Sequence, residues 1–264
     1  MIAMPAQWQI GTAPNFRELG GLRSRDGRRV RHGILYRSGH LFELSEQDRV
    51  LVAATGLSLI CDLRSAKERE SQPARWAAGH APRELHLDVN ADVRAQNDAL
   101  RHKLRDDPTP GGARELMLSI YRTLPQACAR SLGLIFNELL AAGDSLPMLV
   151  NCAAGKDRTG FVCAMLLHAL DVPYQQILDD YLESLPRCDR PRLNAHLLVL
   201  MRERLGIDLE PATITALNGV HAAYLQAAWD FLSAHHGGAD AYLRSVGLDD
   251  ARRAQLQSRL LETL

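Results

Sequence analysis

Short apolar runs and longer amphipathic stretches alternate along most of this chain. Runs of strand length occupy residues 57–61, 86–89 and 148–150, and segments of helical length lie between and after them. Such alternation is typical of α/β proteins with a mostly parallel central sheet flanked by helices. We therefore expect an α/β fold in which residues 148–150 form the central strand. The apolar segment 161–170 is expected to be a buried helix that begins near Arg158.

The N-terminal part of the chain is rich in glycine and arginine between residues 12 and 39. Alternating runs at 29–31 and 34–36 predict a small antiparallel strand pair in this region, with a turn at Asp26-Gly27.

Three helices are expected between the strand runs. The first occupies residues 45–55, because Ser-Glu-Gln-Asp is a typical capped helix start. A segment rich in proline and glycine at 106–112 predicts a loop. Two helices are expected after it, at 113–124 and 125–142, since the second would then have proline at its first position.

The C-terminal part of the chain is expected to be wholly helical. Helices are predicted at 173–185, 192–205, 211–235 and 249–264. No internal repeat and no shift in composition marks a second domain, so residues 1–264 are expected to form a single domain.

A loop of small residues is expected between the central strand and the buried helix, within residues 151–160. Ala153, Ala154 and Gly155 allow the backbone to curl so that successive N–H groups point inward, and the helix that follows adds its positive end. Arg158 can close this ring with a planar, bidentate grip on two phosphate oxygens. The spacing predicts an oxyanion site.

Cys152 is the candidate nucleophile of this loop. Free thiols titrate near pH ~8.5, and a helix N-terminus beside cationic groups favours the thiolate. We expect in-line attack of this thiolate on phosphorus, with Thr159 donating a hydrogen bond to the sulfur when it leaves again. A buried structural cysteine in a turn is the alternative. Lys156 is one of only three lysines, which favours a phosphate-binding role over a solvent-facing loop position.

Composition excludes several classes of function. Apolar residues make up 46% of the 264 positions, charged residues make up 23%, and the formal net charge is zero. These values are ordinary for a soluble globular protein and predict no nucleic-acid partner. Five scattered cysteines without a Cys-x-x-Cys pair predict a reducing compartment, with neither a disulfide framework nor a zinc site. No cofactor or metal is expected.

No membrane anchor is visible in the sequence. No apolar run approaches the roughly 20 residues that span a bilayer, and residues 1–10 lack the basic and apolar regions of a signal peptide. We therefore expect no stable membrane insertion and a cytoplasmic protein, with signal-less secretion as the alternative.

Residues 152–160 resemble the phosphate-binding loop of the cysteine-dependent protein tyrosine phosphatases. The Lys-Asp pair before the arginine is similar to the atypical bacterial branch of that family, which includes tyrosine and phosphoinositide phosphatases. Residues 15–21, 35–39 and 62–65, the last with Glu68, resemble further motifs of that branch. The resemblance extends from about residue 15 to near the C-terminus. One departure is Asn151, where the family usually has histidine.

The resemblance implies a phosphomonoester hydrolase that forms a cysteinyl-phosphate intermediate. Its expected substrates are phosphotyrosine proteins or phosphoinositides, and a second cation at Lys156 would favour heavily phosphorylated groups. Asn15, Arg17 and Asn151 are candidates for supporting the loop by hydrogen bonds, although Asn15 and Arg17 could instead satisfy a local turn. The family also implies a helical lid, here about residues 184–236.

Two aspartates are candidates for the general acid that protonates the leaving oxygen. Asp62 follows a predicted parallel strand and so lies at the edge where open α/β sheets bind ligands. It is an acid, an orienting residue, or a plain cap of the strand end. The resemblance favours Asp157, inside the loop, although its side chain could instead pair with an arginine.

Three other functions remain open at this stage. An arsenate reductase would need partner thiols, and Cys163 and Cys188 have no obvious arrangement for that chemistry. A phosphate-recognition module without activity is favoured only by Asn151. A phosphatase acting chiefly on small molecules or lipids uses the same loop. The oligomeric state is not predicted by the sequence.

Overall fold

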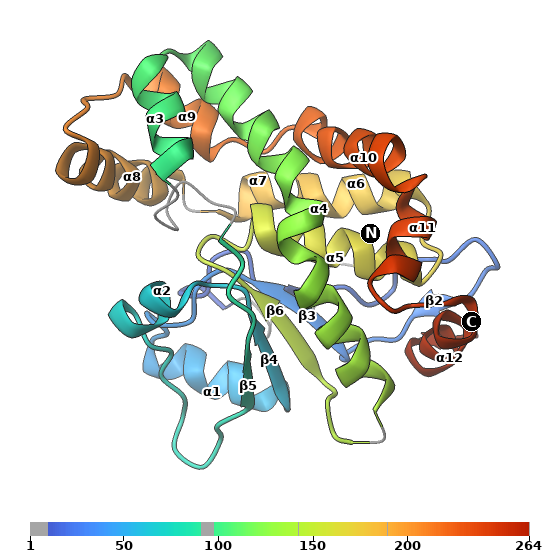
Figure 1. Cartoon of the computed structure of the whole chain (residues 1–264). Helices are drawn as coiled ribbons and strands as arrows, with labels where there is room; N and C mark the ends of the chain where they lie inside the picture. The colour runs from blue at the N-terminus through green and yellow to red at the C-terminus, as the bar shows by residue number, and fades with distance from the viewer. Residues whose placement is uncertain (1–9, 91–97, 142, 189, 264) are drawn as a thin grey trace.

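The computed structural model of the chain describes residues 10–90, 98–141, 143–188 and 190–263. Its central element is a five-stranded sheet with the order β1-β3-β6-β4-β5 (Figure 1). Strands β3, β6, β4 and β5 are parallel to one another, and β1 is antiparallel to β3. The expected α/β class with a mostly parallel sheet is confirmed. The strands are β1 (Arg17–Glu18), β3 (Leu35–Ser38), β4 (Leu59–Asp62), β5 (Arg83–His86) and β6 (Met148–Asn151).

The register of the sheet brings three strand ends together. Asn151, the last residue of β6, is opposite Ser38 at the end of β3 and Asp62 at the end of β4. The loop that follows β6 therefore begins at the carboxyl edge of the sheet, between two neighbouring strand ends. In open α/β sheets this edge is where ligands bind.

Alternate residues of the strands divide the core into two layers. Tyr36, Ile60 and Leu149 belong to a smaller cluster with Val52 of helix α1 (Glu46–Ala54). Their neighbours along the strands lie in the larger cluster against α4 (Pro110–Leu140) and α5 (Asp157–Ala169). Because side chains alternate across a strand, this division places α1 on one face of the sheet and α4 and α5 on the other (Figure 1). Those neighbours are Leu35, Leu59, Cys61, Met148 and Val150.

Helix α4 corrects the expectation of two helices that meet at Pro125. One helix runs through the proline, although proline cannot donate to the carbonyl one turn earlier. Buried residues continue on both sides of Pro125, so packing against the core outweighs the lost hydrogen bond. The loop expected at 106–112 is also shorter. Helix α3 (Asp98–Asp106) ends there, and the Thr109 hydroxyl caps the start of α4.

The small strand pair near the N-terminus is also corrected. The expected turn at Asp26-Gly27 is present, since Arg23 and Arg29 form an antiparallel bridge across it. Strand β2 (Arg29–Val30), however, pairs with β7 (Leu261–Glu262) at the other end of the described chain, and not with the run at 34–36, which belongs to the main sheet as β3. Arg29 and Glu262 form an ion pair at 2.7 Å across this pairing. The predicted final helix therefore stops at Leu260.

The C-terminal part is otherwise helical, as expected. The helix predicted at 211–235 is interrupted after Asn218, and α10 lies along α4 while α9 packs at its N-terminal end with α8 and α3 beside it (Figure 1). The remaining helices are α2 (Ala66–Ser71), α6 (Tyr174–Leu182), α7 (Ser184–Arg187), α8 (Arg190–Leu205), α9 (Pro211–Asn218), α10 (Ala222–His236), α11 (Ala239–Ser245) and α12 (Asp250–Leu260).

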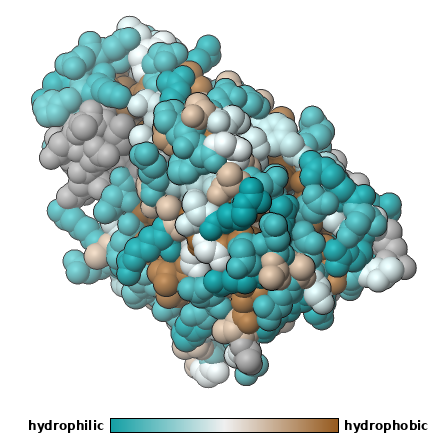
Figure 2. All heavy atoms as spheres, turned by 45° about the vertical axis from the view of Figure 1, so that its right-hand side comes forward, coloured by the Kyte–Doolittle hydropathy of each residue, from teal (hydrophilic) through white to brown (hydrophobic). Residues whose placement is uncertain are grey.

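The surface is mostly polar on the face that Figure 2 shows, where hydrophobic residues are scattered between hydrophilic ones. Among the described helices, none combines the length and the apolar character needed to cross a membrane.

Candidate active site

The loop after β6 places Cys152 at the carboxyl edge of the sheet, and α5 begins five residues later at Asp157. The Cys152 side chain is buried, with the residue 1% exposed. Gly155 has φ 67°, and a Cβ there would lie 2.4 Å from the Gly39 nitrogen. Only glycine fits this close approach. The Ala153 carbonyl accepts a hydrogen bond from the backbone N–H of His40 at 3.0 Å, which attaches the loop to the segment after β3.

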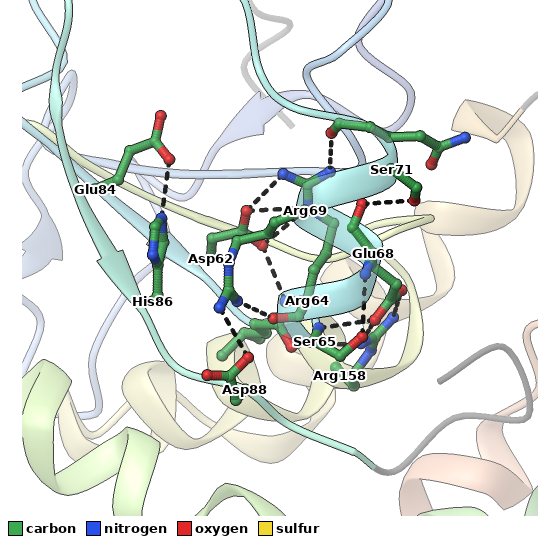
Figure 3. A network of polar contacts seen from close by, with 12 residues as sticks. Asp62, Arg64, Ser65, Glu68, Arg69, Ser71, Glu84, His86, Asp88 and Arg158 are labelled. Atoms are coloured by element: carbon green, nitrogen blue, oxygen red, sulfur yellow. Dashed lines mark hydrogen bonds and ion pairs between the residues drawn. The ribbon is translucent and has the colours of Figure 1, made fainter. Parts of the chain in front are cut away.

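Arg158 comes from the first turn of α5 and is fully buried. Its Nη1 and Nη2 each donate to a carboxylate oxygen of Glu68, both at 2.9 Å, and Nη1 also reaches the Leu63 and Val89 carbonyls at 3.3 Å (Figure 3). Glu68 accepts from the backbone N–H of Ser65 in the capping box of α2. Glu68 is therefore fixed at the start of α2, and its bidentate pair holds the Arg158 guanidinium in one plane.

Asp62 is occupied by a neighbour on its own segment. Its carboxylate accepts the backbone N–H of Arg64 at 2.9 Å and forms an ion pair with the Arg64 guanidinium at 2.7 Å (Figure 3). Both side chains are buried. This geometry is that of a cap at the strand end, which orients the following turn. It matches the plain cap that was one of the three roles expected for Asp62.

Asp157 is buried beside two tyrosines. Its Oδ1 accepts the Tyr121 hydroxyl at 2.7 Å, and the Tyr121 and Tyr181 hydroxyl oxygens lie 2.7 Å apart. Burial, together with the negative charge of Asp157, raises the pKa of Tyr121 well above its ordinary value, so this phenol stays protonated as a donor. No local pattern in the sequence indicates a role for either tyrosine, because Tyr121 lies 36 positions from Asp157 and 60 positions from Tyr181.

Lys156 points into the interior of the protein. Its ammonium donates to the carbonyl oxygens of Leu217 at 3.1 Å and Gly219 at 3.0 Å, and lies 3.3 Å from Oδ1 of Asp157. Carbonyls at the C-terminal end of a helix attract a cation. In this conformation the ammonium therefore connects the phosphate loop to the end of α9.

Asn15 and Arg17 both lie against the phosphate loop or its supports. The Asn15 side-chain amide donates to the Gly155 carbonyl at 2.6 Å, and Arg17 donates to the Asn15 side-chain oxygen. Arg37 also donates to the Gly155 carbonyl, at 2.9 Å. Within a peptide unit the C=O and the following N–H point in opposite directions. Holding this carbonyl outward therefore aims the N–H of Lys156 inward.

Asp180 links the two arginines. Its carboxylate oxygens lie 2.8 Å from Nε of Arg17 and 2.5 Å from Nη1 of Arg37. Burial opposes the charge of Asp180, but the two arginines outweigh burial and hold the pKa of this carboxyl below its ordinary range. Burial and the neighbouring Arg37 lower the pKa of Arg17 to about 10, so it remains charged at neutral pH. Asp180 lies in none of the motifs recognised in the sequence, and Arg37 lies within the motif at 35–39 without an expected role of its own.

Asn151 and Thr159 are buried without all their polar atoms paired. Neither the Asn151 side-chain oxygen nor the Thr159 hydroxyl has a hydrogen-bond partner within the described part of the chain. The hydrogen bond from Thr159 to the Cys152 sulfur is therefore not formed in this conformation and stays a prediction for the step in which the sulfur leaves. Within the described ranges no three His, Cys, Asp or Glu side chains are grouped to hold a metal ion.

Comparison with known proteins places this site in a family. The sequence pattern of the tyrosine phosphatase family matches residues 8–262. The triple specificity protein phosphatase PtpB of Mycobacterium tuberculosis is 30% identical over 289 aligned positions, which cover 98% of each chain. A protein of Cupriavidus necator, provisionally named a tyrosine-protein phosphatase, is 36% identical over 235 residues, or 89% of this chain and 82% of that protein.

A third relative is more distant but has the same name. A tyrosine-protein phosphatase of Nostoc commune is 28% identical over 252 residues, which cover 85% of this chain and 73% of that protein. The family pattern spans the loop with Cys152 and Arg158, the strands that carry it and the helices around it. The chain therefore belongs to the tyrosine phosphatase family and is a protein tyrosine phosphatase.

Proposed function

We propose that the protein hydrolyses phosphomonoesters in two steps through a cysteinyl-phosphate intermediate. The Cys152 sulfur attacks phosphorus, the ester P–O bond breaks, and the leaving oxygen takes a proton from Asp157. Water then attacks phosphorus and gives a proton to Asp157, the S–P bond breaks, and inorganic phosphate leaves the Cys152 thiolate. The observation that carries this proposal is the buried Cys152 at the start of the loop before α5, with Arg158 fixed in the first turn of that helix.

Arg158 and the loop N–H groups would bind the equatorial oxygens of the phosphoryl group. A guanidinium has five N–H donors, so Arg158 can bind phosphate while Glu68 holds it. Donors fixed before the reaction stabilise the charge of the transition state without reorganisation. The contacts of Asn15 and Arg37 with the Gly155 carbonyl supply such rigidity to the loop.

The substrate class we propose is phosphotyrosine in proteins, with phosphoinositides as a second group. The relative from Mycobacterium tuberculosis is named for triple specificity, and this supports a broad choice of substrates. Lys156 is a second cation of the loop and could bind a further phosphate once its ammonium leaves the carbonyls of Leu217 and Gly219. A cytoplasmic location remains a prediction.

We also propose that residues 184–236 act as a lid over the site within a single domain. Four contacts support this assignment. The ammonium of Lys156 reaches α9 and the residue after it, the Arg187 carbonyl accepts the backbone N–H of Asn15 at 3.1 Å, and the Cys188 thiol lies 3.7 Å from the Ala154 carbonyl. The Ser184 hydroxyl lies 3.3 Å from Nη2 of Arg17.

The first test is hydrolysis of p-nitrophenyl phosphate between pH 4 and 9, with Cys152→Ser as the control. We expect activity in the parent and none in the variant. A folded parent that binds vanadate but shows no activity above the variant would contradict hydrolysis and favour a phosphate-recognition module, the alternative raised by Asn151.

A second test separates the substrate classes. Initial rates on phosphotyrosine peptides, phosphoserine peptides and soluble phosphoinositides would be compared at equal concentration. We expect phosphotyrosine to be preferred and phosphoinositides to be cleaved. Activity on lipids or small molecules alone would contradict the protein substrate.

A further inference from the structure

A buried chain of two tyrosine hydroxyls ends at the carboxylate proposed as the general acid. Tyr121 comes from α4, Tyr181 from α6 and Asp157 from the first turn of α5, so three separate helices meet at this point. The exposed fraction of both tyrosines is 0% and that of Asp157 is 3%. The two oxygen–oxygen distances of the chain are both 2.7 Å.

The direction of the hydrogen bonds follows from the number of protons. Each phenol has a single O–H donor. Tyr121 donates its proton to Oδ1 of Asp157, so its oxygen accepts from Tyr181. Burial raises the pKa of both phenols well above the ordinary value, and both therefore keep their protons at every pH at which the enzyme would work. Tyr181 therefore donates to Tyr121, and Tyr121 donates to Asp157.

We propose that Tyr121, with Tyr181 behind it, is a positioning residue for acid catalysis by Asp157. This inference rests on the proposed function. The Tyr121 hydroxyl occupies Oδ1, so the acidic proton of Asp157 resides on Oδ2. In the first chemical step this proton passes to the ester oxygen while the S–P bond forms and the P–O bond breaks. Tyr121 loses no proton in either step.

Tyr121 is suited to this task in a way that Lys156 is not. The Lys156 ammonium also approaches Oδ1, at 3.3 Å, but it is carried by a long flexible side chain, whereas the Tyr121 hydroxyl is held by a buried ring. A neutral phenol can hold the carboxyl group in one orientation in both protonation states. When Lys156 leaves for a substrate phosphate, Tyr121 stays, because the hydroxyl is fixed by the core of α4 and α6.

The test compares leaving groups, because a general acid matters most when the leaving oxygen is basic. In Tyr121→Phe we expect kcat/KM for phenyl phosphate to fall about 10-fold, part of the roughly 10²–10⁴-fold that acid catalysis supplies. The value for p-nitrophenyl phosphate, whose leaving group is a far more acidic phenol, should fall less than about 2-fold. Tyr181→Phe should show the same selectivity with a smaller loss.

Tyr224→Phe is the matched control. Its ring lies 5.6 Å from that of Tyr121, but its hydroxyl donates to the Ala216 carbonyl at 3.2 Å. We expect equal kinetics on both substrates in this variant and the parent. Asp157→Asn should show a larger selective loss than Tyr121→Phe, and adding Tyr121→Phe to Asp157→Asn should cause almost no further selective loss, because both act on one proton.

Three outcomes would overturn the inference. An equal loss on both substrates in Tyr121→Phe would mean that the hydroxyl only stabilises the fold, and unchanged kinetics on both would mean that it has no role. A selective loss that adds fully to that of Asp157→Asn would mean that Tyr121 acts through a group other than Asp157. If Tyr121→Phe does not fold, Tyr181→Phe decides by the same comparison. An inactive parent would instead contradict the proposed function itself.

Discussion

Asp180 supports the phosphate loop indirectly, through two arginines. It is the shared partner of Arg17 and Arg37, and Arg37 holds the Gly155 carbonyl. Removing one partner of a buried ion pair leaves uncompensated charge and destabilises by about 3–5 kcal/mol. We expect Asp180→Asn to lower the free energy of unfolding by about 3 kcal/mol, and to weaken vanadate binding because the loop loses a fixed donor geometry.

Urea denaturation and isothermal titration with vanadate would check this expectation. Asp179→Asn is the matched control, since Asp179 is the preceding residue but is exposed, and its carboxylate accepts from the Gln175 side chain. Similar vanadate affinity in Asp180→Asn and the control would show that the Arg17–Asp180–Arg37 cluster does not order the loop.

Glu68 has a comparable role on the other side of the site. Glu68→Gln keeps the shape of the side chain and its use in the capping box, because glutamine also serves there, but it removes the charged bidentate pair with Arg158. Since small misplacements of a catalytic group can lower rates up to about 10²-fold, we expect kcat/KM to fall about 10-fold. The free energy of unfolding should also fall, by about 3 kcal/mol, because buried Arg158 loses its charged partner. Steady-state kinetics on p-nitrophenyl phosphate would measure this.

Glu70→Gln is the control for that variant, because it lies on the same helix and is exposed. A loss of activity no larger than that of Glu70→Gln would contradict a role for Glu68 in holding Arg158.

The sequence could predict residues whose role is encoded in local spacing, and few others. Cys152, Arg158 and the small residues between them are adjacent in the chain, so their geometry follows from one loop. Asp180 lies 143 positions from Arg37, and nothing near it in the sequence indicates an arginine partner. The burial of Lys156 was likewise invisible, because the carbonyls that bind it come from α9.

The prediction of single helices and strands is likewise limited to what the local sequence encodes. Periodicity predicted β4, β6 and α5 closely, because their apolar pattern reflects burial within the element itself. The sequence predicts a helix start at Pro125, since the rule for proline is local, whereas the packing of α4 against the core is not. The pairing of β2 with β7 joins segments more than 230 positions apart, and each is only two residues long.

The link between α4 and α11 yields a prediction at this scale. The buried Tyr242 hydroxyl donates to the Pro125 carbonyl at 2.6 Å. Removing it should lower the free energy of unfolding by about 1–2 kcal/mol, so Tyr242→Phe should shift the urea midpoint downward. Tyr174→Phe is the control, because its hydroxyl bonds to Gln226 at the surface. Equal stability of the two variants would mean that this bond does not hold the helices together.

At the scale of the whole molecule, the helical third is attached to the catalytic loop through the Lys156 ammonium. A bound oxyanion would compete for that ammonium with the carbonyls of Leu217 and Gly219. A ligand shifts a conformational equilibrium by its differential affinity for the two states. Vanadate should therefore favour a form in which α9 is released from the loop, which would be the open state of the proposed lid.

Hydrogen–deuterium exchange would measure the release. With vanadate we expect faster amide exchange in α9. Exchange in α12, which packs on α4 and α5, should be unchanged. In Lys156→Met the carbonyls have no ammonium to bind, so exchange in α9 should already be fast and should respond little to vanadate. Slower exchange in α9 of the parent with vanadate would contradict this account, because the oxyanion would then be tightening the lid around itself.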